Sequence, residues 1–454
     1  MKDLTEGSVI RHLLHMAAFM AVSMLVQTLY LLADLYWVGR LGREAIAAVG
    51  VAGNLMMVVL ALTQMLGVGT TTLIAQAAGR KDQPHAERAL NESIVMSLLI
   101  GLAFVVVAFL VRDVYCNALS ADVATAALAK IYLLWFIPGL ALQFPLVALS
   151  SALRATGIIK PAVGLQVLSV VLNIVLAPLF IFGLGPAPRM GVSGAALATF
   201  ISILIADVLM VIYFEKKYRY LRLRLNQWRP QIKIWWAMLK VGLPAGAEFA
   251  LWGLDALIVY AIIRPFGAAA QAGFGVGGRV MQALFLPVMA LSFAVGPVVG
   301  QNFGGRRADR VRQAVFAAIG LASAIMVVLA VVVWLTAPAL IRGFSMDADV
   351  IAYGSEFLTI ACVNFLASGI VFSSSSVFQG IGNTVPPLLS TASRLVLFAL
   401  PAALLSRSPG FQIRYVWYIS VASQMVQAGF NLLLLKRELG RRLKFEEVQI
   451  AAPA

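Results

Sequence analysis

The sequence predicts an all-helical integral membrane protein with twelve transmembrane helices, and three observations support this fold class. The chain has 454 residues, of which 61% are hydrophobic and 12% are charged, whereas soluble domains carry about 25% charged residues. The apolar segments are continuous and do not alternate with period two, which argues against a β-barrel. Charged and turn residues divide the chain into twelve apolar runs. Each run is long enough to form a spanning helix, which requires about 20 residues.

The predicted spans follow one another with short polar connections. We place them at residues 12–38, 45–78, 90–111, 124–149, 160–183, 191–214, 238–263, 270–300, 312–341, 350–377, 385–405 and 414–435. The second and eighth runs are long and contain glycines, so we expect tilt or local unwinding in them. The first run is too long for a signal-peptide core and is expected to be retained as the first span.

The distribution of basic residues predicts the orientation of the chain. With the N-terminus inside, the cytoplasmic loops and tails hold 24 of the 35 Lys and Arg, the outer loops hold 9, and Arg279 and Arg394 fall within spans. We therefore expect both termini in the cytoplasm and the protein in the cell inner membrane. The basic segment 216–233 carries interleaved aromatic residues, and we expect it to contact anionic membrane lipid and not nucleic acid.

The chain also repeats itself at one constant offset in the numbering, so that its first and second halves match. The offset pairs Gly42 with Gly267 in one region, and it pairs Gln76 with Gln301 in a second region. Each half contains six spans, so both halves have the same orientation, as in transporters whose two bundles rock about a central site. The repeat predicts an N-terminal lobe at 1–214, a basic linker at 215–234, a C-terminal lobe at 235–436 and a tail at 437–454.

Acidic residues inside spans are the first candidates for function, because each costs about 2.5–3.5 kcal/mol to insert. Asp34 lies in the outer half of the first span and Asp255 in the outer half of the seventh. Glu248 lies seven residues before Asp255 and shares its helical face. Asp207 in the sixth span is a weaker candidate. A carboxylate in a low-dielectric cavity can exchange a proton for a cation, which is the chemistry of an ion-coupled exporter of cations.

Aromatic, sulfur-containing and polar residues of the spans could line a substrate cavity. Such side chains usually pack helices, but facing a cavity with acids they would suit flat lipophilic cations through cation–π contacts and adaptable packing. Arg279 could neutralise an acidic partner. The cavity candidates are Met24, Tyr30, Gln64, Phe144, Trp252, Arg279 and Phe293.

Several sequence motifs follow one another along the chain: LADLYWVGRLG, GTTTLIAQAAGRKD, SALRATGIIKP, LNIVLAP, MGVSGAALAT, GLPAGAE, VGQNFGG and VFQGIGNTVPPLL. Together, and in this order, they resemble the multidrug and toxic compound extrusion (MATE) family. The resemblance covers nearly all of residues 8–435. It implies two six-helix lobes in a V-shaped fold that export organic cations against an inward proton or sodium gradient.

Carried over residue by residue, the resemblance implies an ion-coupling site at Asp34, Asn173 and Thr199. The chain departs from the family at Ala177, where an aspartate is frequent, and at Phe19, where a first-helix proline is frequent. At the repeat offset Phe19 corresponds to Pro244, so the proline is present in one lobe only. Glu248 in GLPAGAE resembles DinF-like members more than NorM-like members, which favours protons over sodium.

We therefore expect a proton- or sodium-coupled antiporter that exports amphiphilic cationic drugs or toxins by alternating access. The alternative is a lipid-linked oligosaccharide flippase of the same superfamily, although such proteins carry more spans and a more cationic cavity. An enzyme is not expected, since the scarce histidines form no catalytic or metal-binding cluster. We expect no cofactor, no metal other than possible sodium as the coupling ion, and a monomer.

Overall fold

The computed structural model describes residues 1–185, 188–228 and 230–445, and the elements assigned in these ranges are helices. The first half forms α1 (Val9–Gly39), α2 (Arg43–Gly79), α3 (Gln83–Leu119), α4 (Val123–Ala155), α5 (Lys160–Phe182) and α6 (Val192–Lys216). The second half forms α7 (Ile232–Ile263), α8 (Ala268–Gly304), α9 (Ala308–Arg342), α10 (Ala348–Ala361), α11 (Asn364–Ile381), α12 (Val385–Leu405) and α13 (Ile413–Arg442). Short 3₁₀ helices lie at Leu225–Gln227 and Arg264–Phe266.

The predicted twelve-span fold class is confirmed. Within the described residues, 11 helices are long and apolar enough to cross a membrane, and the bent pair α10–α11 supplies a twelfth span. The helix bounds also follow the internal repeat. The offset that carries Gly42 onto Gly267 also carries both bounds of α2 onto those of α8, and it carries the start of α3 onto the start of α9.

One predicted span is interrupted. The tenth span, placed at 350–377 as a single run, is bent by 57° between α10 and α11. At the bend the backbone N–H of Val363 donates to Ile360 O and that of Phe365 donates to Cys362 O, and such i→i−3 bonds tighten the chain into a 3₁₀ turn. Of the tilt or local unwinding expected in the second and eighth runs, unwinding is not found, since α2 and α8 are each continuous over 37 residues.

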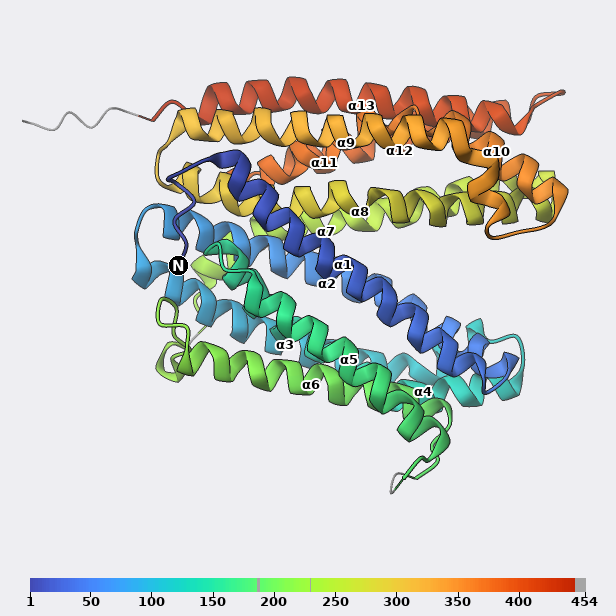
Figure 1. Cartoon of the computed structure of the whole chain (residues 1–454), viewed down its shortest axis with the longest axis horizontal. Coiled ribbons are helices and arrows are strands. Elements are labelled where there is room, and N and C mark those ends of the chain that lie inside the picture. Colours follow the sequence, from blue (N-terminus) through green and yellow to red (C-terminus); the bar gives the residue numbers. More distant parts are fainter. Residues whose placement is uncertain (186–187, 229, 446–454) are drawn as a thin grey trace, which may run out of the picture. The chain divides into compact units, whose positions relative to one another are not determined.

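The chain forms two compact units, whose boundaries cut through α1, α2 and α7. One unit comprises residues 1–2, 15–74 and 82–254, and the other comprises 3–14, 75–81 and 255–454. In the first unit α4 packs against α3 and α6, and α5 packs against α6. In the second unit α8 packs against α9, α10 and α11, while α13 packs against α11 and α12 (Figure 1). Each unit thus has its own helical core.

The ends of α2 and α8 cross at a reciprocal glycine contact inside the second unit. A Cβ on Gly79 would lie 1.9 Å from Gln301 O, and a Cβ on Gly304 would lie 2.1 Å from Gln76 O. Only glycine allows this approach of the two backbones. The repeat offset pairs Gln76 with Gln301 and Gly79 with Gly304, so the repeated motif has a structural reason.

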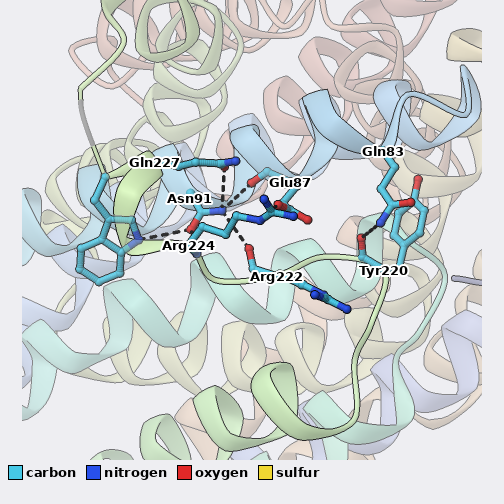
Figure 2. A network of polar contacts seen from close by, with 8 residues as sticks. Gln83, Glu87, Asn91, Tyr220, Arg222, Arg224 and Gln227 are labelled. Atoms are coloured by element: carbon cyan, nitrogen blue, oxygen red, sulfur yellow. Dashed lines mark hydrogen bonds and ion pairs between the residues drawn. The ribbon is translucent and has the colours of Figure 1, made fainter.

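The segment between α6 and α7 is bound to α3 by hydrogen bonds and an ion pair. Figure 2 shows the Asn91 side chain among residues of this segment. Its amide nitrogen donates to Arg222 O at 2.9 Å, and its amide oxygen accepts from the Arg224 N–H at 2.8 Å. Glu87 forms an ion pair with Arg224 (Figure 2). Glu92 accepts from the Trp235 Nε1–H at 2.8 Å. This segment is therefore held by specific contacts of its backbone as well as its side chains.

Other basic side chains at the start of the same segment are exposed, next to residues that are buried. Tyr218 and Leu221 are buried, and the Tyr218 hydroxyl hydrogen-bonds Thr156 Oγ1 at 2.6 Å. Lys216, Lys217 and Arg219 are exposed. Arg229, which belongs to the predicted basic cluster, and residues 446–454 of the predicted tail lie outside the described residues.

Candidate ion-coupling site

The first helix places Tyr30 and Asp34 one turn apart on one face of α1. Asp34 is buried, with an exposed fraction of 7%. Its Oδ1 has no hydrogen-bond partner among the described residues. Asp34 lies close enough to Tyr30 and to Tyr132 of α4 to interact electrostatically with both. An unpaired carboxylate at such a position is costly, so a functional role is the default interpretation.

Helices α5 and α6 bring the other two predicted ion-coupling residues together. Asn173 Nδ2 donates to Thr199 Oγ1 at 3.1 Å, and both side chains are buried. The Tyr30 hydroxyl lies 3.0 Å from the same Thr199 oxygen. Tyr30, which sequence reasoning placed among the cavity candidates, therefore links the first helix to the Asn173–Thr199 pair.

The hydrogen bonds of Thr199 determine the donors in this cluster. The Thr199 hydroxyl donates to Ala195 O at 3.2 Å, so its single proton is used and the Tyr30 O–H must be the donor in their shared bond. Thr199 Oγ1 then accepts from Tyr30 and from Asn173, which occupies both of its lone pairs. Within this cluster, Asp34 Oδ1 and Asn173 Oδ1 are buried and have no donor among the described residues.

The cluster can accept a proton with less rearrangement than a sodium ion. Carboxylate, amide and hydroxyl oxygens are the ligands that hard cations prefer, so the residue types are compatible with sodium. However, Thr199 Oγ1 can ligate a cation only after Tyr30 or Asn173 releases it. A proton on Asp34 needs no such rearrangement, and it would supply a donor where acceptors are in excess. The described residues contain no group of three or more His, Cys, Asp or Glu that could hold a metal ion.

The two departures from the family motifs lie at defined positions. Ala177 is fully buried on α5, one turn after Asn173, so no second carboxylate stands beside Asn173 there. Phe19 lies on a continuous α1, where its ring contacts Lys160 Nζ at 5.7 Å from the centroid. Pro244 lies inside α7.

The other acidic candidates lie in different environments. Asp207 is buried on α6, and neither carboxylate oxygen has a hydrogen-bond partner in the described ranges. Glu248 is buried on α7. Asp255 forms an ion pair with Arg394 of α12 at 3.1 Å. Sequence reasoning noted Arg394 only as a basic residue within a span and missed this pairing.

The remaining cavity candidates are spread over several helices. Phe144 is fully buried, its ring centroid 6.0 Å from that of Phe104. Trp252 lies against Phe249 at 4.7 Å between ring centroids. Arg279 is exposed, and no ion pair to an acidic residue is seen for it within residues 1–185, 188–228 and 230–445. Half-buried side chains are Met24, Gln64, Trp252 and Phe293.

The fold and the site define a multi-pass helical membrane protein with repeated halves and a buried carboxylate in its first helix. The MatE family model matches residues 20–179 and 244–405, which together exceed half of the chain. The chain therefore belongs to the MATE family of transporters.

Three similar proteins illustrate the range within this family. The chain is 26% identical over 416 residues to the FAD transporter of Shewanella oneidensis, covering 89% of this chain and 90% of that protein. It is 28% identical over 382 residues to the multidrug export protein MepA of Staphylococcus haemolyticus, covering 83% and 82%. Its structure matches a MOP superfamily transporter from Pyrococcus furiosus with a TM-score of 0.90 and 28% identity over 98% of both chains. The binding pocket of that protein is described as having reverse polarity, which suggests a different function.

Proposed function

We propose that this protein is a cation-coupled multidrug antiporter that exports amphiphilic organic cations by alternating access. The similarity to multidrug export proteins such as MepA supports a role in drug export. The observation that carries the coupling is the buried carboxylate of Asp34, whose Oδ1 has no partner among the described residues, one turn from the Tyr30 that hydrogen-bonds the Asn173–Thr199 pair. In this proposal the two six-span halves act as the lobes of the exporter, with both termini in the cytoplasm and the protein in the inner membrane as a monomer.

We further propose that the coupling ion is a proton. Thr199 Oγ1 already has its donor and acceptor capacity filled, whereas Asp34 Oδ1 is free to take a proton. The proton enters from outside and neutralises Asp34, which weakens the hold on a bound organic cation and releases it outward. Return of the lobes to the inward state delivers the proton to the cytoplasm. This assignment agrees with the DinF-like resemblance of the GLPAGAE segment.

The test is the movement of ethidium in proteoliposomes under an imposed proton gradient and, separately, under a sodium gradient. We expect the proton gradient alone to drive ethidium movement in the wild type, and Asp34→Asn to abolish it. The exposed Asp113 on α3 provides the control, and Asp113→Asn should transport normally. Driving by sodium alone would overturn the proton assignment. No movement under either gradient would overturn drug export and favour the lipid-linked oligosaccharide flippase.

A further inference from the structure

Asp255 of α7 and Arg394 of α12 form an ion pair within helices that cross the membrane. Arg394 Nη1 and Nη2 lie 3.1 and 3.2 Å from the same oxygen, Asp255 Oδ2. The side chains are largely withdrawn from solvent, with exposed fractions of 13% for Arg394 and 20% for Asp255. Charges in such helices are expensive and mark functional positions.

The pairing between these two side chains is incomplete. Arginine and carboxylate interact most strongly through two parallel bonds that use both carboxylate oxygens. Here both bonds reach one oxygen, and within the described residues neither Asp255 Oδ1 nor Arg394 Nε has a hydrogen-bond partner. Both of these atoms are buried. Arg394 therefore retains a charged donor that a second oxyanion could use.

Neutral polar side chains lie on α12 and on the neighbouring α13. Thr391, one turn before Arg394 on α12, accepts a hydrogen bond from Gln427 of α13 at 3.0 Å. Asn431, one turn after Gln427, is fully buried, and its two amide atoms are unpartnered in the described part of the chain. Uncompensated buried polar groups are costly, so α13 carries an unused polar group on the helix that packs against α12.

The internal repeat relates this pair to the ion-coupling site. The repeat offset carries Tyr30 onto Asp255, and it carries Thr199 onto Gln424. The first-half site has a carboxylate without a basic partner, whereas the second-half site contains its own cation. Arg394 disfavours a second cation there, so this pair is suited to a negatively charged group.

We propose that the Asp255–Arg394 pair binds an anionic group, a carboxylate or a phosphate, of a transported amphiphile. The inference rests on the export function proposed above and extends its substrates to zwitterionic and anionic amphiphiles. The oxyanion accepts from Arg394 Nε and shares or takes over the bonds now made to Asp255. Asp255 neutralises Arg394 whenever no substrate is bound.

The test uses two ligand pairs that differ only in the anionic group. Norfloxacin is compared with its ethyl ester, and riboflavin 5′-phosphate with riboflavin, by binding to the full-length protein in dodecyl maltoside. The proteins are the wild type, Arg394→Gln, Asp255→Asn and the double variant, which carries neither charge. Melting temperatures with and without each ligand show whether every variant is folded.

The wild type should bind the anionic member of each pair about 10-fold more tightly, as expected for one charge-assisted hydrogen bond. Arg394→Gln and the double variant should lose this preference, so that the two members of each pair bind them equally. Asp255→Asn should strengthen the preference for the anionic ligand, because the competing carboxylate is gone. This variant should also melt at a lower temperature, since Arg394 is left unpaired, and the anionic ligand should restore much of that loss. The proposal would be overturned if the wild type bound the two members of each ligand pair equally, or bound none of the four ligands.

Two further results distinguish this proposal from lipid binding at Arg394 and from the proposed export function. Loss of the acid preference on adding phosphatidylglycerol would assign Arg394 to a lipid headgroup and would also overturn it. Ethidium carries no anionic group, so its transport by the wild type reports on drug export alone. Failure of ethidium transport with an intact acid preference would reject the export of cations and retain the anion site.

Discussion

At the scale of single residues, the proposed coupling site is defined by the atoms that its hydrogen bonds leave without a partner. Thr199 Oγ1 binds Ala195, Asn173 and Tyr30, and a hydroxyl has no further capacity. Asp34 Oδ1 and Asn173 Oδ1 lack donors among the described residues. The site as folded can therefore accept a proton without breaking a bond, whereas a metal cation that takes Thr199 as a ligand must break one.

Removing the Tyr30 hydroxyl should change which ion the site accepts. Tyr30→Phe frees one lone pair of Thr199 Oγ1 for a cation, at the loss of one hydrogen bond worth about 1 kcal/mol. We expect slower proton-driven ethidium transport and a stimulation by sodium that the wild type lacks. Initial rates in proteoliposomes with and without sodium measure this effect.

Tyr36→Phe is the matched control, because Tyr36 is exposed on the same helix and its hydroxyl bonds Arg40 instead. It should leave the response to sodium unchanged. If sodium left the transport rate of Tyr30→Phe unchanged, as expected for the wild type, the role assigned to the Thr199 lone pairs would be contradicted.

The sequence could predict part of this site because buried polar residues stand out in apolar spans. Asp34 was identified by its charge, while Asn173 and Thr199 were identified through family motifs, and the structure brings the last two into contact. The Asp255–Arg394 pair could not be predicted, because its members lie 139 residues apart and on helices whose packing the sequence does not reveal. The role of Tyr30 as a hydrogen-bond donor also depends on the packing of α1 against α6.

At the scale of helices, the crossing of α2 and α8 should be the least tolerant of added volume. Gly79→Ala and Gly304→Ala would each place a methyl group within about 2 Å of a backbone carbonyl oxygen. Because backbone cannot move aside like a side chain, each change should cost more than the 1–3 kcal/mol typical of overpacking. Thermal unfolding of the purified variants measures the loss.

Gly53→Ala on α2 is the control, since nothing lies within 4 Å of its added Cβ. Alanine is the better helix former by about 1 kcal/mol, so this change should preserve or raise the melting temperature. Equal melting temperatures for Gly53→Ala and Gly79→Ala would show that α2 and α8 do not pack at the repeated glycines.

The helices themselves were predictable because lipid requires long apolar segments, and all twelve predicted spans correspond to helices or to the bent pair. The bend between α10 and α11 was not, because no proline or glycine lies at Cys362–Asn364 to indicate it. The attachment of the 217–231 segment to α3 was also missed. It depends on side-chain contacts such as those of Asn91, which leave no periodic signal in the sequence.

At the scale of the whole chain, the two halves repeat their helices but not their chemistry. The helix bounds follow the repeat offset, whereas the charged groups do not. Among the described residues, the carboxylate of Asp34 in the first half has no basic partner, whereas the second half pairs Asp255 with Arg394. One half is thus suited to titration and the other to electrostatic recognition, a division of roles that the repeat alone does not predict.

The central claim is that substrate and proton exchange at Asp34, and proton release on substrate binding tests it most directly. Ethidium is added to the purified protein in weakly buffered solution at a pH where transport is active, and the released protons are counted with a pH indicator. We predict proton release from the wild type and from Asp113→Asn, and none from Asp34→Asn with its melting temperature retained. Equal proton release from Asp34→Asn and the wild type would contradict the account, because another group would then carry the proton.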